Sequence, residues 1–282
     1  MVSSKFTTLL RIVALAALVG GGSAGIGRAQ SPTGDLVART GLRVCADPRD
    51  LPFSDQQREG FENKIAELLG QALSLPVEYV WYPQVIGFSR NTLQAGRCDL
   101  VIGTVAGDSE MDTTNPYYYT GYVIVLRNDK GLAFNGFDDP RLKDLHIGVI
   151  ARTPPADLLI RHGLMTTARP YPLTVDTRVD APSRQMISDI VDRKIDAGLL
   201  WGPLAGYYIH HDHLPLTLVM LKDEPQAPRM QYHIAMGVRH NEVDWRRKLN
   251  SLIQAKQQEI DHILADYGVP LLNEQGGLLG LR

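Results

Sequence analysis

Apolar residues follow two different periods in the first part of the chain. Residues 42–46 and 77–82 are short runs rich in apolar, β-branched or aromatic side chains, which predicts strands. Between them, residues 61–73 place their apolar side chains on one face at a period of 3.6, which predicts an amphipathic helix. A short helix over residues 89–95 and a third strand over residues 99–105 follow. This β-α-β-α-β order predicts a parallel sheet with covering helices.

The same pattern occurs a second time. Residues 145–150, 168–173 and 195–201 are predicted strands, and the second of these is the weakest. Helices are predicted over residues 154–162 and over residues 182–191, where proline suits the first helical turn. The chain is therefore expected to hold two α/β halves of similar construction.

The two halves also end alike, and two apolar strands connect them. In both halves a basic residue leads to an aspartate, Asp99 or Asp196, and then to an apolar strand and a glycine. Residues 122–126 lead out of the first half, and residues 233–238 return to it. Two such crossings predict a two-lobed α/β fold with a double-strand hinge.

A last long helix is expected from Asn241, a good capping residue, to a stop at Gly268. It is expected to pack on the first lobe and to be followed by a loose, glycine-rich tail from Asn273. The predicted organisation is a signal peptide over residues 1–29, lobe 1 over residues 30–124 plus 236–282, and lobe 2 over residues 125–235.

The composition excludes several classes of protein. The chain has 282 residues, of which 44% are hydrophobic and 21% charged, as in ordinary globular proteins. Its net charge is −2, and no basic stripe with interleaved aromatic residues is present. Nucleic-acid binding needs concentrated positive charge, so we expect none.

The N-terminus has the features of a secretory signal peptide. Lys5 and Arg11 precede an uncharged apolar run over residues 12–26, and Ala29 ends a small-residue cleavage site before Gln30. The alternative is a membrane anchor, but the run is shorter than the ~20 residues that a span needs. We therefore expect a cleaved signal and a periplasmic protein.

The chain has two cysteines, Cys45 and Cys98, on predicted strands of the first lobe. An exported protein meets an oxidising compartment, which favours one disulfide between them. Two buried thiols are the alternative. No histidine or further thiol lies at ligand spacing from either cysteine, so a metal site is not expected.

Ligands of open parallel sheets bind beyond the carboxyl ends of the strands. If two lobes face each other, the residues at those ends line one cleft, which we expect to be aromatic and poor in ions. The alternative is that the aromatic residues are ordinary core and rim packing. The candidate cleft residues are Asp47, Phe53, Trp81, Tyr82, Thr104, Tyr117, Trp201 and Tyr207.

Other features suggest no chemistry. Residues 210–213 (HHDH) could bind a metal, but the end of a solvated helix is the favoured interpretation. Glu62 and Glu67 are expected on the surface of a helix, and nothing marks a pair of carboxylates as catalytic. The chain has no G-x-S-x-G, H-E-x-x-H or P-loop motif. We therefore expect no enzyme, no metal and no cofactor.

Several stretches between residues 42 and 272 together make the chain recognisable. They include residues 42–48 (LRVCADP), 51–54 (LPFS), 59–69 (EGFENKIAELL), 98–99 (CD), 116–118 (PYY), 138–143 (DDPRLK), 201–207 (WGPLAGY) and 267–272 (YGVPLL). In these stretches the chain resembles the type II periplasmic solute-binding proteins of ABC transporters, and more narrowly the quinoprotein dehydrogenase-associated MxaJ/XoxJ-type proteins of methanol oxidation.

The resemblance implies an accessory protein that helps a periplasmic PQQ-dependent alcohol dehydrogenase mature or become active. The implied partners are that quinoprotein dehydrogenase and its cytochrome c. PQQ and the metal would belong to the dehydrogenase rather than to this chain.

The chain departs from the amino-acid binders of the same fold. Residues 103–112 (GTVAGDSEMD) hold no arginine to clamp a ligand carboxylate, and Pro154 and Pro155 remove two backbone donors. A free amino acid is therefore a poor candidate ligand. Two other functions stay open: a transporter receptor for another small solute, partnered by an ABC permease, and a cleft enzyme such as a dehydratase.

Overall fold

The first half of the fold is a parallel sheet covered by an amphipathic helix. In this computed structural model, which describes residues 40–130, 134–173 and 181–279, strand β1 (Leu42–Ala46) lies between β4 (Val77–Trp81) and β5 (Leu100–Val105). Helix α1 (Phe61–Leu73) has the predicted bounds. These elements confirm the predicted order of the first half, and the predicted signal peptide lies outside the described residues.

The second short helix of this half differs from the prediction. Helix α2 spans only Phe88–Asn91 and begins after Gly87, whose φ of 88° places it in the left-handed region. Thr92 leaves the helical conformation, and its hydroxyl donates to the carbonyl of Phe88 at 2.7 Å. That side-chain bond competes with helix continuation, so residues 92–95 form turns instead.

The second half is built in the same way. Strand β10 (Ala197–Trp201) pairs in parallel with β8 (Ile147–Ile150), and β8 pairs in parallel with β9 (Arg169–Tyr171), as the sequence predicts. Strand β11 (Leu216–Met220), which the sequence analysis does not predict, pairs with β7 (Tyr118–Arg127). The elements are η2 (Asn128–Lys130), η3 (Pro140–Asp144), β8 (Ile147–Ile150), α3 (Pro154–Arg161), β9 (Arg169–Tyr171), α4 (Pro182–Val191), β10 (Ala197–Trp201), α5 (Gly202–His211) and β11 (Leu216–Met220).

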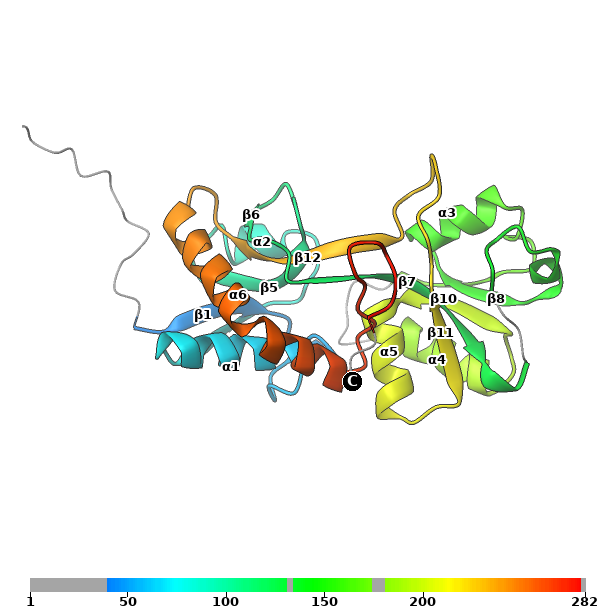
Figure 1. Ribbon diagram of the computed structural model, residues 1–282, viewed down its shortest axis with the longest axis horizontal. Helices are drawn as coiled ribbons and strands as arrows, with labels where there is room; N and C mark the ends of the chain where they lie inside the picture. The colour runs from blue at the N-terminus through cyan, green and yellow to red at the C-terminus, as the bar shows by residue number, and fades with distance from the viewer. Residues whose placement is uncertain (1–39, 131–133, 174–180, 280–282) are drawn as a thin grey trace, which may run out of the picture. The chain divides into compact units, whose positions relative to one another are not determined.

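Two long strands join the halves. β7 (Tyr118–Arg127) and β12 (Gln231–Val238) run antiparallel to each other, with Ile234 opposite Tyr118 and Gln231 opposite Gly121. β12 continues along β5, and β7 continues along β10, which gives the strand order β4-β1-β5-β12-β7-β10-β8-β9. The short strand β6 (Asp112–Thr113) also pairs with β12. Figure 1 shows β7 and β12 side by side.

The predicted likeness of the two halves extends to hydrogen bonds. The backbone N–H of Asp99 donates to the carbonyl of Arg43 at 2.7 Å, and that of Asp196 donates to the carbonyl of His146 at 2.8 Å. In each half the aspartate side chain also binds the same partner residue. Each aspartate therefore ties the entrance of one parallel strand to its neighbour.

The last helix, α6 (Val243–Asp266), begins two residues later than predicted. Asn241 has a φ of 68°, and the N-cap position belongs to Glu242. As predicted, α6 packs against the first half, beside α1 (Figure 1). The tail from Asn273, which was expected to be loose, has backbone bonds as far as residue 279: the N–H of Asn273 donates to the carbonyl of Gly277, and the N–H of Leu279 to that of Leu271.

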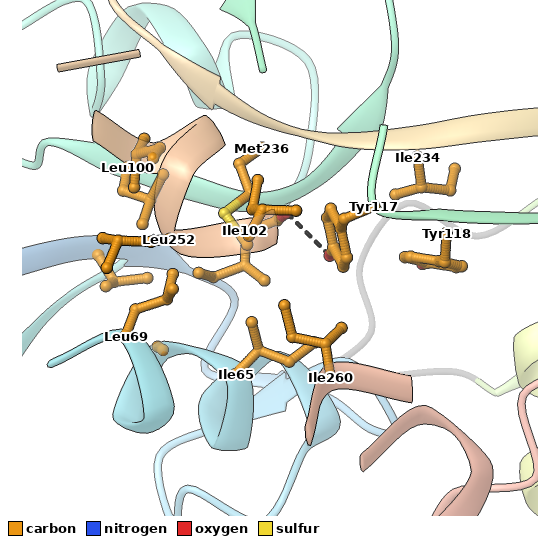
Figure 2. Packing of buried hydrophobic residues seen from close by; sticks show 14 of the residues in the cluster. Ile65, Leu69, Leu100, Ile102, Tyr117, Tyr118, Ile234, Met236, Leu252 and Ile260 are labelled. Carbon is orange, nitrogen blue, oxygen red and sulfur yellow. Dashed lines mark hydrogen bonds between the residues drawn. The ribbon is translucent and has the colours of Figure 1, made fainter. Parts of the chain in front are cut away.

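The largest hydrophobic cluster lies between α1, the sheet and α6. In Figure 2, Ile65 of α1, Ile102 of β5 and Ile260 of α6 converge, and all three are at most 2% exposed. The hydroxyl of Tyr117 donates to the carbonyl of Ile102 at 3.0 Å within this cluster. Burying each large aliphatic side chain contributes about 1.5–3 kcal/mol, so this cluster fixes α6 to the first half.

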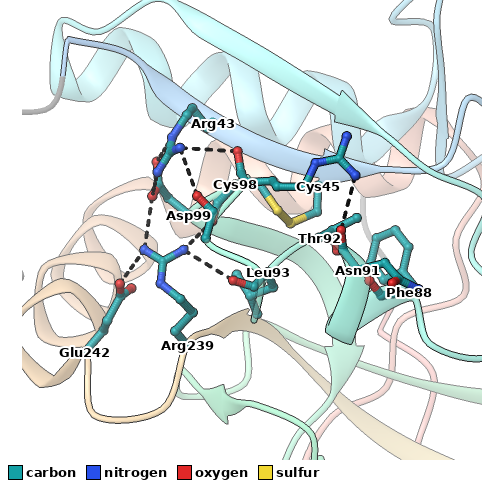
Figure 3. The surroundings of a disulfide bond; sticks show 12 residues. Arg43, Cys45, Phe88, Asn91, Thr92, Leu93, Cys98, Asp99, Arg239 and Glu242 are labelled. Atoms are coloured by element: carbon teal, nitrogen blue, oxygen red, sulfur yellow. Dashed lines mark hydrogen bonds and ion pairs between the residues drawn. A yellow bond between two sulfur atoms is a disulfide. The ribbon is translucent and has the colours of Figure 1, made fainter.

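The predicted disulfide is present. Cys45 on β1 and Cys98, just before β5, are bonded with their Cα atoms 5.5 Å apart (Figure 3). Both cysteines are buried. In the part of the chain that the structure describes, no helix is both long enough and apolar enough to cross a membrane.

Candidate functional site

Two adjoining cavities lie at the carboxyl ends of the parallel strands. The first, of about 360 Å³, is lined by residues of both halves, from the Arg49–Phe53 loop to Thr153, Pro182 and Tyr208. The second, of about 330 Å³, lies next to β5 and includes Gly103 and Thr104. The residues that line both cavities are Asp50, Phe53, Gln84 and Trp201. The two cavities therefore form one cleft site with a shared middle.

The loop that carries Asp50 and Phe53 is held by a buried carboxylate. Short strands β2 (Arg49–Asp50) and β3 (Ser54–Asp55) pair to form the loop, and Asp47 lies just before it. The Asp47 carboxylate accepts from the backbone N–H of Arg49 at 2.8 Å and from that of Gln84 at 2.7 Å. Asp47 therefore positions two segments that line the cavities.

Three of the eight residues that the sequence analysis places in the cleft line these cavities. Phe53 and Trp201 line both cavities, and Thr104 lines the second. The indole of Trp201 packs edge to face on Tyr122 and on Tyr232, with ring centroids 5.1 and 5.7 Å apart. Trp201 therefore connects the crossing strands to the middle of the cleft.

The other five residues do not line either cavity. Asp47 is 3% exposed and binds backbone groups. Trp81 stacks on Tyr79 with ring centroids 4.6 Å apart, and the hydroxyl of Tyr82 accepts from Asn91. Their side chains pack within the first half.

Tyr117 and Tyr207 have packing roles as well. Tyr117 is 3% exposed and belongs to the cluster between α1 and α6. Tyr207 stacks on Tyr267, with ring centroids 6.1 Å apart. Contact of any of the eight residues with a ligand or a partner stays a prediction.

Two carboxylates in the cleft contradict the expected ion-poor lining. Asp50 lines both cavities, and Glu62 lines the second. The sequence analysis places Glu62 on a surface helix without a role, whereas its carboxylate lines the second cavity beside Gly103 of β5. A Cβ on Gly103 would lie 2.1 Å from Oε1 of Glu62, so a larger residue at this position would force the carboxylate to move from its place.

Burial changes the protonation of both carboxylates. Desolvation, and next the charges of Asp50 and Asp47, raise the pKa of Glu62 from 4.5 to about 8. Desolvation and the charge of Asp47 raise the pKa of Asp50 from 3.8 to about 7. Both groups therefore titrate near neutral pH, which is typical of functional clefts.

The remaining candidate motif is a surface feature, as predicted. Residues 210–213 lie at the exposed end of α5, and His211 Nδ1 lies 2.7 Å from a carboxylate oxygen of Asp212. The described residues hold no group of three or more metal-ligating side chains.

A family model described as bacterial extracellular solute-binding proteins, family 3, matches residues 42–269. The chain belongs to this family. The crystal structure of periplasmic binding protein XoxJ from Methylobacterium extorquens AM1 is similar, with 38% identity, a TM-score of 0.70, and coverage of 83% of this chain and 100% of that one. The crystal structure of MxaJ from Methlophaga aminisulfidivorans MPT shares 27% identity, with a TM-score of 0.72, and covers 82% of this chain and 100% of that one.

A curated relative agrees with these structures. Protein MoxJ of Methylorubrum extorquens is 30% identical over 247 residues, which are 82% of this chain and 81% of that protein. The predicted resemblance to the MxaJ/XoxJ-type proteins and the type II periplasmic binding protein fold are thus both confirmed.

The cleft of this solute-binding protein is expected to make its stability depend on pH. The Glu62 carboxyl has a pKa of about 8 in the folded chain and its ordinary value of 4.5 in the unfolded chain. Between these two pH values the folded chain keeps a proton that the unfolded chain has lost. Folding stability therefore falls as the pH rises through that window. We expect Glu62 to account for about 2 kcal/mol, less than its full pKa change implies, because the side chain keeps some contact with solvent in the cavity.

The measurement is urea unfolding at pH 5.5 and pH 8.5 for the wild type and for Glu62→Gln. The fall in stability between the two pH values should be about 2 kcal/mol smaller in Glu62→Gln, while Asp50 keeps its own contribution. Glu67→Gln, the same change one and a half turns along α1, is the control and should behave as the wild type. Equal pH dependence in Glu62→Gln and the wild type would contradict the assignment.

Proposed function

We propose that this chain is a periplasmic binding protein that serves as an accessory to a PQQ-dependent methanol or alcohol dehydrogenase. The observation that carries the proposal is the 38% identity to XoxJ over the whole length of that structure. Such identity lies well above that of the amino-acid binders of the same fold, which are about 20% identical to this chain. An accessory role in maturation or activity, with contact to the dehydrogenase or its cytochrome c, is the finer part of the proposal.

The cleft is the proposed docking site. Its middle is formed by Phe53 and Trp201, and aromatic residues at a cavity are the anchors that binding surfaces use most. Three large apolar side chains are exposed near it: Leu173 lines the first cavity, Val105 lines the second, and Ile86 is two residues from Gln84. Apolar side chains at the rim suit a protein segment better than a small polar solute.

The experiment is co-elution of residues 30–282 with the quinoprotein dehydrogenase from the same organism, combined with dye-linked alcohol oxidation with and without this protein. We expect a complex at micromolar concentrations or a gain in activity. Trp201→Ala should weaken the complex at least tenfold, since truncating a central aromatic anchor costs about 2 kcal/mol or more.

Trp81→Ala is the matched control, because Trp81 is the same residue type outside both cavities. It should leave binding within about twofold of the wild type. An unchanged affinity in Trp201→Ala would exclude the cleft as the docking site. No complex and no gain in activity would exclude the accessory role.

The second candidate is a receptor of an ABC transporter for a small solute. The family match and the presence of two cavities between parallel strand ends favour it. This receptor would show a rise in melting temperature with its solute and no effect on the dehydrogenase.

An enzymatic role is not proposed. The sequence offers no acid–base pair, whereas the structure brings Asp50 and Glu62 to one cavity with pKa values near neutrality. The relatives are nevertheless solute-binding proteins. A ligand is therefore the favoured use of these carboxylates.

A further inference from the structure

The chain connects its two lobes a third time, directly after α6. Two successive residues of this connection are buried in different hydrophobic clusters. Leu271, which is 3% exposed, belongs to the main cluster of the first lobe, and Leu272, also 3% exposed, belongs to a cluster of the second lobe. Val269 lies in the same cluster as Leu271. Residues 267–272, which we call the brace, are therefore anchored in both cores.

Two glycines of α5 let the brace lie directly against the second lobe. A Cβ on Gly206 would lie 2.0 Å from the carbonyl oxygen of Gly268, and a Cβ on Gly202 would lie 2.9 Å from Cγ of Pro270. Figure 1 shows the end of α6 beside α5. Because backbone lies against backbone here, the two surfaces have no free space in which to slide past each other.

Aromatic packing extends this contact toward the cleft. The ring of Tyr267 stacks on Tyr207 of α5, with centroids 6.1 Å apart, and packs edge to face on Phe61, with centroids 5.9 Å apart. Phe61 packs edge to face on Phe53 at 5.2 Å, and Phe53 lines both cavities. The hydroxyl of Tyr267 also donates to the carbonyl of Glu59. The middle of the cleft is therefore connected to the brace by contacts between rings.

Hydrogen bonds fix the brace to a crossing strand as well. The hydroxyl of Thr120 on β7 donates to the carbonyl of Pro270 at 2.7 Å, and the N–H of Leu272 donates to the carbonyl of Tyr119 at 2.8 Å. Thr120 is fully buried, so breaking its bond would leave polar groups without water to replace it. The brace is thus bonded to the hinge and packed on both lobes.

Two crossing strands alone would form a hinge about which the lobes can rotate. Contacts at the hinge move little during such a rotation, whereas contacts farther from it must slide. Gly202 lies against Gly121 of β7, and Tyr207 is about 7.5 Å farther along α5. A closing rotation would therefore separate Tyr207 from Tyr267 and strain the connection between the two clusters.

We infer that the brace holds the two lobes at one angle, so that the cleft does not close and keeps one width. Receptors of small solutes enclose their ligand by a hinge motion of two lobes. A cleft of fixed width instead suits a segment of a folded protein, because such an occupant stays attached to its own domain and cannot be enclosed. The fixed angle is a property of this chain alone, whereas its use for docking rests on the proposed function.

The test is the distance between two spin labels, one on each lobe, measured by double electron–electron resonance on residues 30–282. The described residues hold no free cysteine, so the labels attach only to the introduced ones. Suitable exposed positions are Ala72→Cys on α1 and Ile160→Cys on α3. We expect one narrow distribution of distances in this labelled protein, because its lobes keep one angle.

Two further substitutions release the brace in different ways. Gly206→Ala pushes Gly268 away from α5 without weakening the helix, since alanine favours a helix more than glycine does. Leu272→Ala removes the anchor in the second lobe. Each should widen the distance distribution by about twofold or more, because freed lobes sample several angles.

Leu216→Ala is the matched control for Leu272→Ala, because Leu216 is a buried leucine of the same cluster that lies outside the brace. It should leave the distribution as narrow as without it, and circular dichroism checks that each variant folds. The inference is overturned if the distribution is already broad or two-peaked with the brace intact. It is also overturned if neither Gly206→Ala nor Leu272→Ala widens the distribution, or if Leu216→Ala widens it equally.

The distribution with the brace intact is decisive by itself should a variant fail to fold. The dehydrogenase is absent from these measurements, so their outcome is separate from that of the accessory role. Lobes at one angle without any complex would contradict the proposed function alone, and mobile lobes with a complex would contradict the brace alone.

Discussion

Replacement of Asp99 by alanine is expected to lower the free energy of unfolding by about 2–3 kcal/mol, as for hydrogen bonds to charged groups. Its carboxylate is 2% exposed and accepts two bonds from Arg43, at 2.6 and 2.9 Å, and one from Arg239 at 3.2 Å (Figure 3). Arg239 also donates to the carbonyl of Cys98. Loss of the carboxylate leaves the Arg43 guanidinium without its main counter-ion, whereas Arg239 keeps its ion pair with Glu242.

The control for this variant is Asp196→Ala, at the corresponding place in the second half. Asp196 accepts from the backbone N–H of His146 at 2.9 Å, and its side chain is 20% exposed. We expect a cost of about 1 kcal/mol, as for an ordinary hydrogen bond. Urea unfolding followed by circular dichroism measures both. An equal loss of unfolding free energy in the two variants would show that the two arginines add nothing to the contribution of Asp99.

Removal of the Cys45–Cys98 disulfide is expected to cost about 4 kcal/mol. The cysteines are 53 residues apart in sequence, and closing a loop of that length in the unfolded chain accounts for a stabilisation of this size. For a chain of this length the melting temperature should fall by roughly 8–16 °C. Scanning calorimetry of the Cys45→Ala/Cys98→Ala variant measures the change.

The double variant also provides the control for reduction. A reducing agent should lower the melting temperature of the wild type toward that of the double variant and should not affect the double variant itself. A wild type that melts at the same temperature with and without the reductant would contradict the prediction.

The sequence predicts an element best where the apolar residues follow one clear spacing, that of a helix or that of a strand. Helix α1 was predicted residue for residue because Phe61, Ile65 and Leu69 repeat at helical spacing and are all fully buried. Strand β11 was not predicted, because its partner β7 is distant in sequence and only that pairing identifies Leu216–Met220 as a strand. Helix α2 is shorter than predicted because the Thr92 hydroxyl donates to the carbonyl of Phe88. The period of the apolar residues gives no sign of such a bond.

Only part of the site could be predicted, because a local sequence pattern does not show which side chains face the cleft. Phe53, Thr104 and Trp201 follow or end predicted strands, so the rule for strand ends found them. Tyr117 and Tyr207 also lie near these strand ends, but their side chains pack against other residues. The residue type alone does not distinguish a packed tyrosine from one that lines a cleft. Glu62 was missed because a charged residue in the first turn of an amphipathic helix is usually solvated. Gly103 inside a strand was the available signal.

The chain leaves the first half along β7, builds the second half and returns along β12. This path sets the order in which the two halves can be completed during synthesis. The hydrophobic clusters of the second half draw their members from Val123 to Met230, apart from Leu272. The main cluster of the first half needs Ile234 and Met236 of β12 and Trp245 of α6. A nascent chain released as far as residue 230 thus holds nearly all of the second core but an unfinished first one. We therefore expect the half that is made first to complete its core last, contrary to the usual N-terminal-first order.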